Sequence, residues 1–236
     1  MFILIIQARM GSTRLPGKVL HKFKDKTMLE WCIQRCLLCK KVNKVIVASS
    51  INAENDIIEN LCKQNKIECY RGSENDVLDR YYTISKMYVG YDDCNIIRIT
   101  SDCPLVCPYM IDDMVNFFNN NSYDYITNHS NKDFITPEGS SIEIFKFKTL
   151  KYLWEHNKDI NLREHVTGYL PSVNLFDNKI KKGVYNYLPS YLYPNLVKEK
   201  LSVDTEDDYN KVKTIVNYFD NYNFSYKEVL DKLNTR

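Results

Sequence analysis

The chain has 236 residues, of which 44% are hydrophobic and 26% charged, so it can bury one core and fits a single domain over 1–236. Its net charge is only +2 and its lysines and arginines are scattered, so we expect no nucleic-acid partner. No stretch approaches the roughly 20 apolar residues of a membrane helix, and the N-terminal apolar run lacks a signal peptide's basic start and cleavage site. We therefore expect a soluble cytoplasmic protein with no membrane partner.

The first eighteen residues predict a buried strand followed by an anion-binding loop. Residues 2–6 are apolar and rich in β-branched side chains, as in a buried strand. The loop that follows carries cations, hydroxyls and glycines, namely Arg9, Gly11, Ser12, Thr13, Arg14, Gly17 and Lys18. Glycines let a backbone approach a ligand closely, and successive N–H groups form a nest for an anion. The stretch predicts a phosphate-binding loop in a nucleotide enzyme.

This loop follows neither of the two common nucleotide-binding patterns. Five residues separate Gly11 from Gly17 and Val19 follows the lysine, so both the spacing and the metal-binding hydroxyl of the P-loop are missing. The dinucleotide pattern G-x-G-x-x-G is also absent. The alternative, a solvated basic loop, is less favoured because such a loop has no need of arginines and glycines beside a core strand.

Strand and helix patterns alternate through the first half of the chain. Predicted strands cover 2–6, 44–48, 66–70, 95–100 and 123–127, and predicted helices cover 28–40, 52–64, 75–89 and 108–120. Such βα units predict an α/β fold with a mainly parallel sheet and helices on both faces. Because ligands bind beyond the carboxyl ends of parallel strands, we expect 9–18, Ser49, Arg71 and Asp102 to surround one crevice.

The second half is less regular. Residues 140–145 alternate like a strand, and a helical segment follows that ends near 163–167. The Tyr-, Pro- and Asn-rich segment 171–199 could form a hairpin or a dimerisation arm. A strand over 200–203 and helices over 206–218 and 226–233 complete the prediction.

Cys32, Cys36 and Cys39 have the C-x3-C-x2-C spacing of radical enzymes that hold a four-iron cluster. The same positions share one face of a helix, and the surrounding sequence is that of a continuous amphipathic helix. We therefore favour three core residues over cluster ligands. The other five cysteines form no paired C-x2-C motif, so we expect reduced thiols.

Two aspartates lie where magnesium-phosphate enzymes place metal ligands. Asp102 follows the strand at 95–100, and Asp204 follows the strand predicted at 200–203. Magnesium takes one or two carboxylates and completes its octahedron with water and phosphate oxygens. The alternatives are a turn residue for Asp102 and a helix N-cap for Asp204, and both weaken beside the cationic loop.

Together these segments resemble a known family. QARMGSTRLPGKVL resembles the signature loop of the sugar cytidylyltransferases, which include the CMP-Kdo and CMP-sialate synthetases. The resemblance is closest to the spore coat polysaccharide protein F group, and it continues through YRGSENDVLDRYY, RITSDCPLV, PEGSSIEIF, REHVT and LSVDTEDDY. It implies a three-layer, Rossmann-like fold of the nucleotide-diphospho-sugar transferase type.

The resemblance also implies CTP and Mg2+ as partners and a role for each matching residue. The expected nucleotide-binding residues are Ala8, Arg9, Gly11, Ser12, Arg14, Lys18, Ser49, Arg71, Gly72 and Asp102, with Arg9 and Lys18 catalytic. Asp102 and Asp204 are the expected metal ligands, and Glu143, Arg163 and His165 fall where the acceptor should lie. Residues 128–200 form the expected acceptor-binding and dimerisation subregion of a homodimer, with 181–196 as the candidate contact.

One departure from the family leaves the acceptor open. CMP-Kdo synthetases carry H-x-S-G-T-D-R after the third strand, whereas this chain has YRGSEND at 70–76. The predicted reaction is transfer of CMP from CTP to an acidic sugar or related acceptor, in surface polysaccharide or glycoconjugate biosynthesis. The alternatives are another nucleoside triphosphate, a phosphate or phosphonate acceptor, or an inactive nucleotide-binding module.

Overall fold

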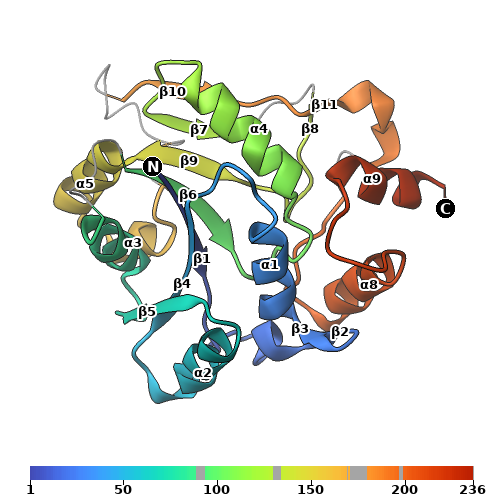
Figure 1. The fold of residues 1–236 in the computed structure, drawn as a ribbon, viewed down its shortest axis with the longest axis horizontal. Coiled ribbons are helices and arrows are strands. Elements are labelled where there is room, and N and C mark those ends of the chain that lie inside the picture. The colour runs from blue at the N-terminus through green and yellow to red at the C-terminus, as the bar shows by residue number, and fades with distance from the viewer. Residues whose placement is uncertain (89–93, 130–133, 169, 171–179, 197–198, 236) are drawn as a thin grey trace.

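A seven-stranded sheet forms the centre of the computed structural model, which describes residues 1–88, 94–129, 134–168, 170, 180–196 and 199–235 (Figure 1). The strand order is β10-β7-β9-β6-β1-β4-β5. The strands are β1 (Phe2–Gln7), β4 (Lys44–Ser50), β5 (Glu68–Gly72), β6 (Asn95–Thr100), β7 (Tyr125–Thr127), β9 (Glu143–Lys146) and β10 (Lys182–Val184). Only β9 runs antiparallel to its neighbours, so the predicted mainly parallel sheet is confirmed.

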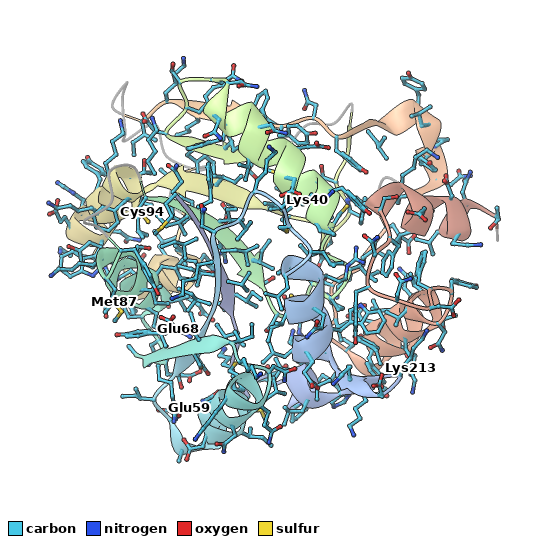
Figure 2. The ribbon with its side chains drawn as sticks, in the orientation of Figure 1. Lys40, Glu59, Glu68, Met87, Cys94 and Lys213 are labelled. Carbon is cyan, nitrogen blue, oxygen red and sulfur yellow. The ribbon has the colours of Figure 1, made fainter. Side chains whose placement is uncertain are left out.

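Helices cover both faces of this sheet, and their side chains pack against it on both sides (Figure 2). One face carries α1 (Met28–Cys36), α2 (Asp56–Gln64), α4 (Pro108–Asn119), α8 (Glu206–Val216) and α9 (Tyr226–Asn234). The opposite face carries α3 (Val77–Lys86) and α5 (Phe147–His156), with α6 (Ile160–Glu164) against α3. The predicted three-layer α/β fold is confirmed.

The alternation of side chains along β1 divides the core into two. Leu4 and Ile6 belong to the core under α1 and α4, whereas Ile3 and Ile5 belong to the core under α3 and α5. All four are fully buried, which explains why this strand reads as a continuous apolar run.

Short elements connect and flank these layers. They are the hairpin β2 (Lys22–Phe23) with β3 (Lys26–Thr27), the pair β8 (Phe134–Ile135) with β11 (Leu188–Pro189), and the 3-10 turns η1 (Lys18–Leu20), η2 (Ala53–Asn55), η4 (Ser190–Leu192) and η5 (Pro194–Leu196). Capping boxes start α1 at Thr27, α8 at Thr205 and α9 at Ser225.

The prediction of a strand over 200–203 is wrong. Lys200 makes only an isolated bridge to Glu138, and the next hydrogen bonds go to two separate segments. The N–H of Leu201 donates to the Glu138 carbonyl, whereas the N–H of Val203 donates to the Asp102 carbonyl. The segment alternates polar and apolar residues like a strand, but it forms a connector. The reason is that its backbone hydrogen-bond partners lie on two different segments.

Several predicted boundaries shift by a few residues. The helix predicted over 28–40 ends at Cys36, and the helix predicted over 52–64 divides into η2 and α2. The strand predicted over 66–70 spans Glu68–Gly72, and α3 ends at Lys86, while residue 89 lies outside the described residues. The unassigned segment 171–199 includes β10 and β11 in its described part.

The cysteine face of α1 belongs to the core, as predicted. Cys32 and Cys36 are fully buried against the sheet, and Cys39 lies beyond the end of the helix. Burial raises the pKa of both Cys36 and Cys39, which favours neutral thiols. None of the helices in the described residues is long and apolar enough to cross a membrane.

Candidate active site

A cavity of about 410 Å³ opens at the carboxyl ends of β1 and β6. Gln7 and Ala8 at the end of β1 form its floor with Thr100 and Asp102 at the end of β6. The loop 9–18, the N-terminal part of α3, the end of α6 and the start of α8 supply the other walls. The cavity lies where the topology of a parallel sheet places ligands.

The loop after β1 is held in shape by backbone contacts. The side chain of Asn55 accepts a hydrogen bond from the N–H of Met10 at 2.8 Å, and the carbonyl of Met10 accepts from the N–H groups of Ser12 and Gly17. Gly17 has φ +65°, a left-handed conformation that favours glycine. Gly11 has no such requirement, and an added Cβ there would meet only ordinary contacts.

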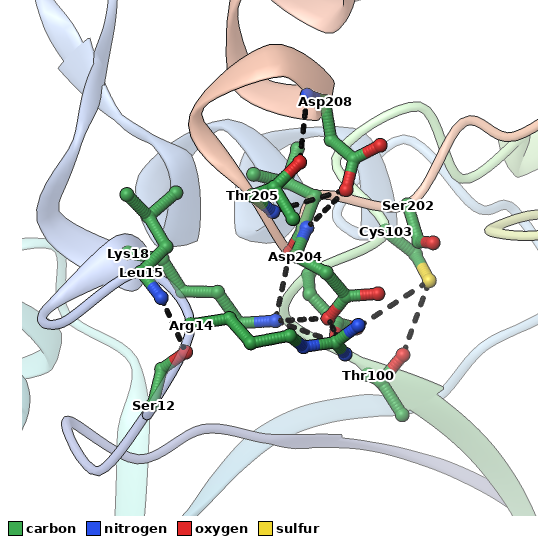
Figure 3. Close-up of polar contacts among 12 residues, drawn as sticks. Ser12, Arg14, Leu15, Lys18, Thr100, Cys103, Ser202, Asp204, Thr205 and Asp208 are labelled. Carbon is green, nitrogen blue, oxygen red and sulfur yellow. Dashed lines mark hydrogen bonds and ion pairs between the residues drawn. The ribbon is translucent and has the colours of Figure 1, made fainter.

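Lys18 links the loop to both predicted metal ligands. Figure 3 shows its contact with Asp204. Its Nζ lies 3.0 Å from an oxygen of Asp102 and 3.0 Å from an oxygen of Asp204, and it donates to the Val203 carbonyl at 2.7 Å. Only 12% of the Lys18 side chain is exposed. Segments that are far apart in the sequence therefore meet at one ammonium group.

Asp204 is held by three cations. Besides Lys18, Arg14 contacts the same carboxylate oxygen at 3.0 Å, and Lys200 contacts the other oxygen at 3.1 Å. Burial alone would raise the pKa of Asp204, but the ion pairs with Lys18 and Lys200 hold the pKa below its usual value. The carboxylate is therefore ionised at neutral pH.

Arg9 points toward carboxylates on the opposite wall. Its Nη1 lies 3.3 Å from Glu74, in the turn before α3, and its Nη2 lies 2.6 Å from Glu164 at the end of α6. About 40% of the Arg9 side chain is exposed, so the guanidinium remains accessible from the cavity. A bound triphosphate would compete with Glu74 and Glu164 for this cation.

The carboxylates of Asp102 and Asp204 fit a divalent metal ion. Each carboxylate has one oxygen within 3.0 Å of the Lys18 ammonium, so the two side chains already surround one cation. The described residues contain no group of three or more His, Cys, Asp or Glu side chains placed to hold a metal. Two carboxylates completed by water and phosphate oxygens match the preference of Mg2+ rather than that of a closed structural site.

Three of the predicted nucleotide-binding residues do not line the cavity. Ser49 on β4 is fully buried, and its hydroxyl has no partner among the described residues. Arg71 and Gly72 lie on β5, where Arg71 contacts Asp56 and Glu59 at 2.7 Å each and donates to the Ser50 carbonyl. Ala8, Arg9, Gly11, Ser12, Arg14, Lys18 and Asp102 all line it.

Of the three predicted acceptor residues, only His165 lines the cavity. Arg163 is buried in an internal network, where it contacts Asp76 at 2.8 Å and donates to the carbonyls of Trp154 and Asn157. Glu143 on β9 is also buried and accepts hydrogen bonds from three neighbours, described below. Neither side chain belongs to the cavity lining.

Sequence reasoning missed several polar residues of the cavity wall. Gln7 and Thr100 follow the strand-end rule that identified Asp102 and could have been found with it. Arg98 interrupts the otherwise apolar strand NIIRIT, and Arg80 interrupts the apolar face of α3. A cation inside a buried pattern is the signal in both cases.

The two arginines differ in how their charge is balanced. Burial lowers the pKa of Arg80, whose Nη1 donates to the Ala48 carbonyl. Burial would also lower the pKa of Arg98, but the neighbouring Glu143 carboxylate holds it above its usual value. Both remain cationic at neutral pH.

Comparison with known proteins assigns the chain to a family. A family model described as cytidylyltransferase matches residues 3–229. The chain belongs to the cytidylyltransferase family. It is therefore a nucleotidyltransferase, and the predictions of family and enzyme class are confirmed.

Similarities to individual proteins support this family assignment. The chain is 28% identical over 228 residues to spore coat polysaccharide biosynthesis protein SpsF of Bacillus subtilis, covering 90% of this chain and 85% of SpsF. A solved cytidylyltransferase from Leptospira borgpetersenii is similar with a TM-score of 0.88 and 32% identity, covering 99% of this chain and 94% of that one. The CTP complex of CMP:2-keto-3-deoxy-manno-octonic acid synthetase shares the fold, with a TM-score of 0.64 and 15% identity over 92% of this chain and 98% of that one.

Proposed function

We propose that this cytidylyltransferase moves the cytidylyl group of CTP to an acidic sugar or related acceptor and releases pyrophosphate. The observation that carries the proposal is the convergence of Lys18, Asp102 and Asp204 beside the phosphate-binding loop, within the cavity. The similarity to spore coat polysaccharide biosynthesis protein SpsF and to the CMP:2-keto-3-deoxy-manno-octonic acid synthetase supports a place in polysaccharide or glycoconjugate biosynthesis. The proposed compartment is the cytoplasm, and the proposed assembly is a homodimer.

In the proposed reaction an acceptor oxygen attacks the α-phosphorus, and the bond between the α-phosphorus and the α–β bridging oxygen breaks. Negative charge moves onto the pyrophosphate oxygens, so fixed cations stabilise the transition state. Arg9 and Lys18 face the same cavity and supply such charges. Where the acceptor is a neutral hydroxyl, His165 in the cavity wall accepts its proton, whereas an ionised phosphate oxygen needs no base.

Asp102 and Asp204 are the proposed ligands of Mg2+. A bound divalent ion supplies charge neutralisation to the triphosphate oxygens. Lys18 would then leave both carboxylates, because the ammonium and a divalent ion would occupy the same position between them and repel each other. Released from this pair, its ammonium is available to the phosphates, and Arg14 at the rim of the loop gains the same freedom.

Calorimetry of CTP binding tests the proposed metal site. In the wild type we expect CTP to bind at least about tenfold more tightly with magnesium than without it, a difference of about 1.4 kcal/mol. The double variant Asp102→Asn, Asp204→Asn should lose this enhancement. Asp207→Asn, on the exposed first turn of α8, is the matched control and should keep it. Equal magnesium dependence in the double variant would remove both assignments.

A further inference from the structure

Arg98 on β6 is a largely buried cation in the cavity wall. It lies opposite Ile5 of β1 and Glu143 of β9 in the sheet register. Its side chain is 17% exposed, and it forms part of the cavity lining. Its neighbours on β6, Ile97 and Ile99, point to the opposite core and are buried. A guanidinium in the middle of a central strand is costly unless its N–H groups are used.

One side of this guanidinium is fixed by Glu143. Nη1 of Arg98 donates to Oε2 of Glu143 at 2.6 Å. The other oxygen of Glu143 accepts from the hydroxyls of Tyr125 and Thr167. Glu143 therefore already accepts from three neighbours, and it lies outside the cavity lining. It positions Arg98 rather than reaching a ligand itself.

The other side of the guanidinium has no hydrogen-bond partner among the described residues. Nε of Arg98 is buried without a hydrogen-bond partner among the described residues, and Nη2 donates to none of them. Arg35 shows the contrast, because its Nε, Nη1 and Nη2 donate to the carbonyls of Val106, Tyr222 and Phe224. All three guanidinium nitrogens of Arg35 are thus partnered. An orphaned buried donor costs about 1–3 kcal/mol, which a ligand can recover.

Arg80, in the same cavity wall, also has a buried Nε without a partner among the described residues, and the side-chain oxygen Oε1 of Gln7 is orphaned there too. Three polar atoms of this wall therefore lack a hydrogen-bond partner among the described residues. This pattern indicates that the wall binds a polar group of a ligand.

We propose that the Nε–Nη2 edge of Arg98 binds the carboxylate of the acceptor. This edge presents two parallel N–H groups that match the two oxygens of a carboxylate. A phosphate monoester also fits an arginine fork, but its second negative charge would lie close to Glu143, which already neutralises Arg98. The inference rests on the proposed function and narrows its acceptor to a sugar acid. Arg163 is unavailable for this role, since Asp76 and two carbonyls occupy it.

Binding of the acceptor is tested directly by NMR of the arginine Nε–H groups in protein loaded with CTP and calcium. The probes are 3-deoxy-manno-octulosonate and N-acetylneuraminate, the methyl ester of each, and glucose 1-phosphate. The Arg98 resonance is assigned by its loss in Arg98→Lys. We expect at least one free acid to shift this resonance, and neither its methyl ester nor the sugar phosphate to do so.

Steady-state kinetics with that acid, CTP and magnesium gives a second readout. Arg98→Gln should raise KM for the acid by about 30-fold or more, the size expected for losing a charge-assisted hydrogen-bond pair. KM for CTP should stay within about twofold by the same reasoning, because CTP does not use this edge. Arg98→Lys should recover part of the loss, and Lys148→Gln, whose ion pair with Asp124 lies outside the cavity, should change neither constant.

Three results would overturn the proposal: no acid shifts the Arg98 resonance, the methyl ester shifts it equally, or Arg98→Gln raises both KM values together. CTP calorimetry separates this failure from failure of the proposed function. Unchanged magnesium-dependent CTP binding in Arg98→Gln would leave the nucleotide half of the site in place. Absence of CTP binding in the wild type would remove the proposed function itself.

Discussion

Lys18 is the residue on which the site depends, because it holds together two carboxylates that would otherwise repel one another. Its ammonium contacts both Asp102 and Asp204 at 3.0 Å. In the protein without nucleotide it stands where a metal ion would neutralise the same pair. One lysine therefore serves the free enzyme as a counter-ion and, in the proposed reaction, the triphosphate as a cation.

Removal of this ammonium should separate the two roles. In Lys18→Ala the paired carboxylates lose their counter-ion, so we expect manganese to bind without nucleotide about tenfold more tightly, close to 1.4 kcal/mol. Turnover should fall, with kcat/KM reduced by about 100-fold or more, as when one transition-state donor is removed. Manganese electron paramagnetic resonance and pyrophosphate release measure the two effects.

Lys26→Ala is the control for this experiment, because Lys26 pairs with Glu30 outside the cavity. Neither quantity should change in it. Weaker manganese binding in Lys18→Ala, or near-normal turnover, would contradict the dual role.

At the residue scale, the sequence predicted those cavity residues that belong to one local motif. The loop residues and Asp102 were predictable because a strand end and a cationic loop are local patterns. Arg71 and Arg163 have the same charge but lie in internal ion pairs with Glu59 and Asp76, partners that no local pattern reveals. Arg98 was not predicted as a site residue, because its position beside Glu143 depends on the register between β6 and β9, and the two residues are 45 positions apart in the sequence.

At the scale of elements, the start of α8 positions the second carboxylate. Thr205 and Asp208 form a capping box, and Asp208 also accepts from the N–H of Asp204 and contacts Lys200 at 2.6 Å. These contacts fix the turn that presents Asp204 to Lys18 (Figure 3). The segment before it was predicted as a strand because its polar and apolar residues alternate. A connector whose hydrogen bonds go to two segments can have the same sequence pattern.

Acid should weaken this turn only at low pH. Burial alone would raise the pKa of Asp208, but Lys200, the N–H groups of Asp204 and Thr205, and the Thr205 hydroxyl lower it to about 2, from 3.8 for an ordinary aspartate. Its stabilisation is therefore present above pH 3.8 and lost as the pH falls through about 2. It amounts to about 2 kcal/mol of unfolding free energy at neutral pH.

Urea unfolding at pH 6 and pH 2.5 tests this contribution. Asp208→Asn should be less stable than the wild type at pH 6 by about 2 kcal/mol, and the difference should shrink at pH 2.5. Asp207→Asn, on the exposed side of the same turn, should track the wild type at both pH values. A constant difference across the two pH values would contradict the assignment.

Arg35 joins α1 to the loop before α9. Its three guanidinium nitrogens donate to three backbone carbonyls, and its guanidinium lies over the Phe224 ring at 3.6 Å. Arg35→Ala would leave those carbonyls buried without donors, so we expect a loss of about 3–5 kcal/mol of unfolding free energy. Lys151→Ala, which removes an ion pair with Glu155 on the exposed side of α5, should cost less than about 1 kcal/mol. Equal urea midpoints for the two variants would contradict this role.

At the scale of the molecule, serial βα units were enough to predict the layers but not the order of the sheet. The reversed strand β9 inserts between β6 and β7, and β10 pairs with β7 at the sheet edge. Both pairings join distant segments, so no local periodicity specifies them. The cavity is nevertheless at the predicted edge, because β1 and β6 are adjacent and parallel.

The proposed homodimer should use the segment 181–196, where β10 is an edge strand and exposed apolar side chains gather. Tyr191 is 77% exposed and Leu192 is 46% exposed. We expect a dimer in sedimentation velocity, and a monomer for the variant Tyr191→Asp, Leu192→Asp. Met87→Asp, at an exposed methionine on the α3 side, should remain dimeric. A monomeric wild type would remove the proposed assembly.

The most direct test of cytidylyl transfer is to follow the phosphorus atoms. Purified protein is incubated with CTP, magnesium and sugar acids, sugar phosphates or phosphonates, and 31P NMR follows the products. The account predicts one new CMP-conjugate resonance for each pyrophosphate released, with a sugar acid as acceptor and with CTP in preference to ATP, GTP or UTP. Orthophosphate release without a conjugate, or intact CTP with every acceptor, would contradict it.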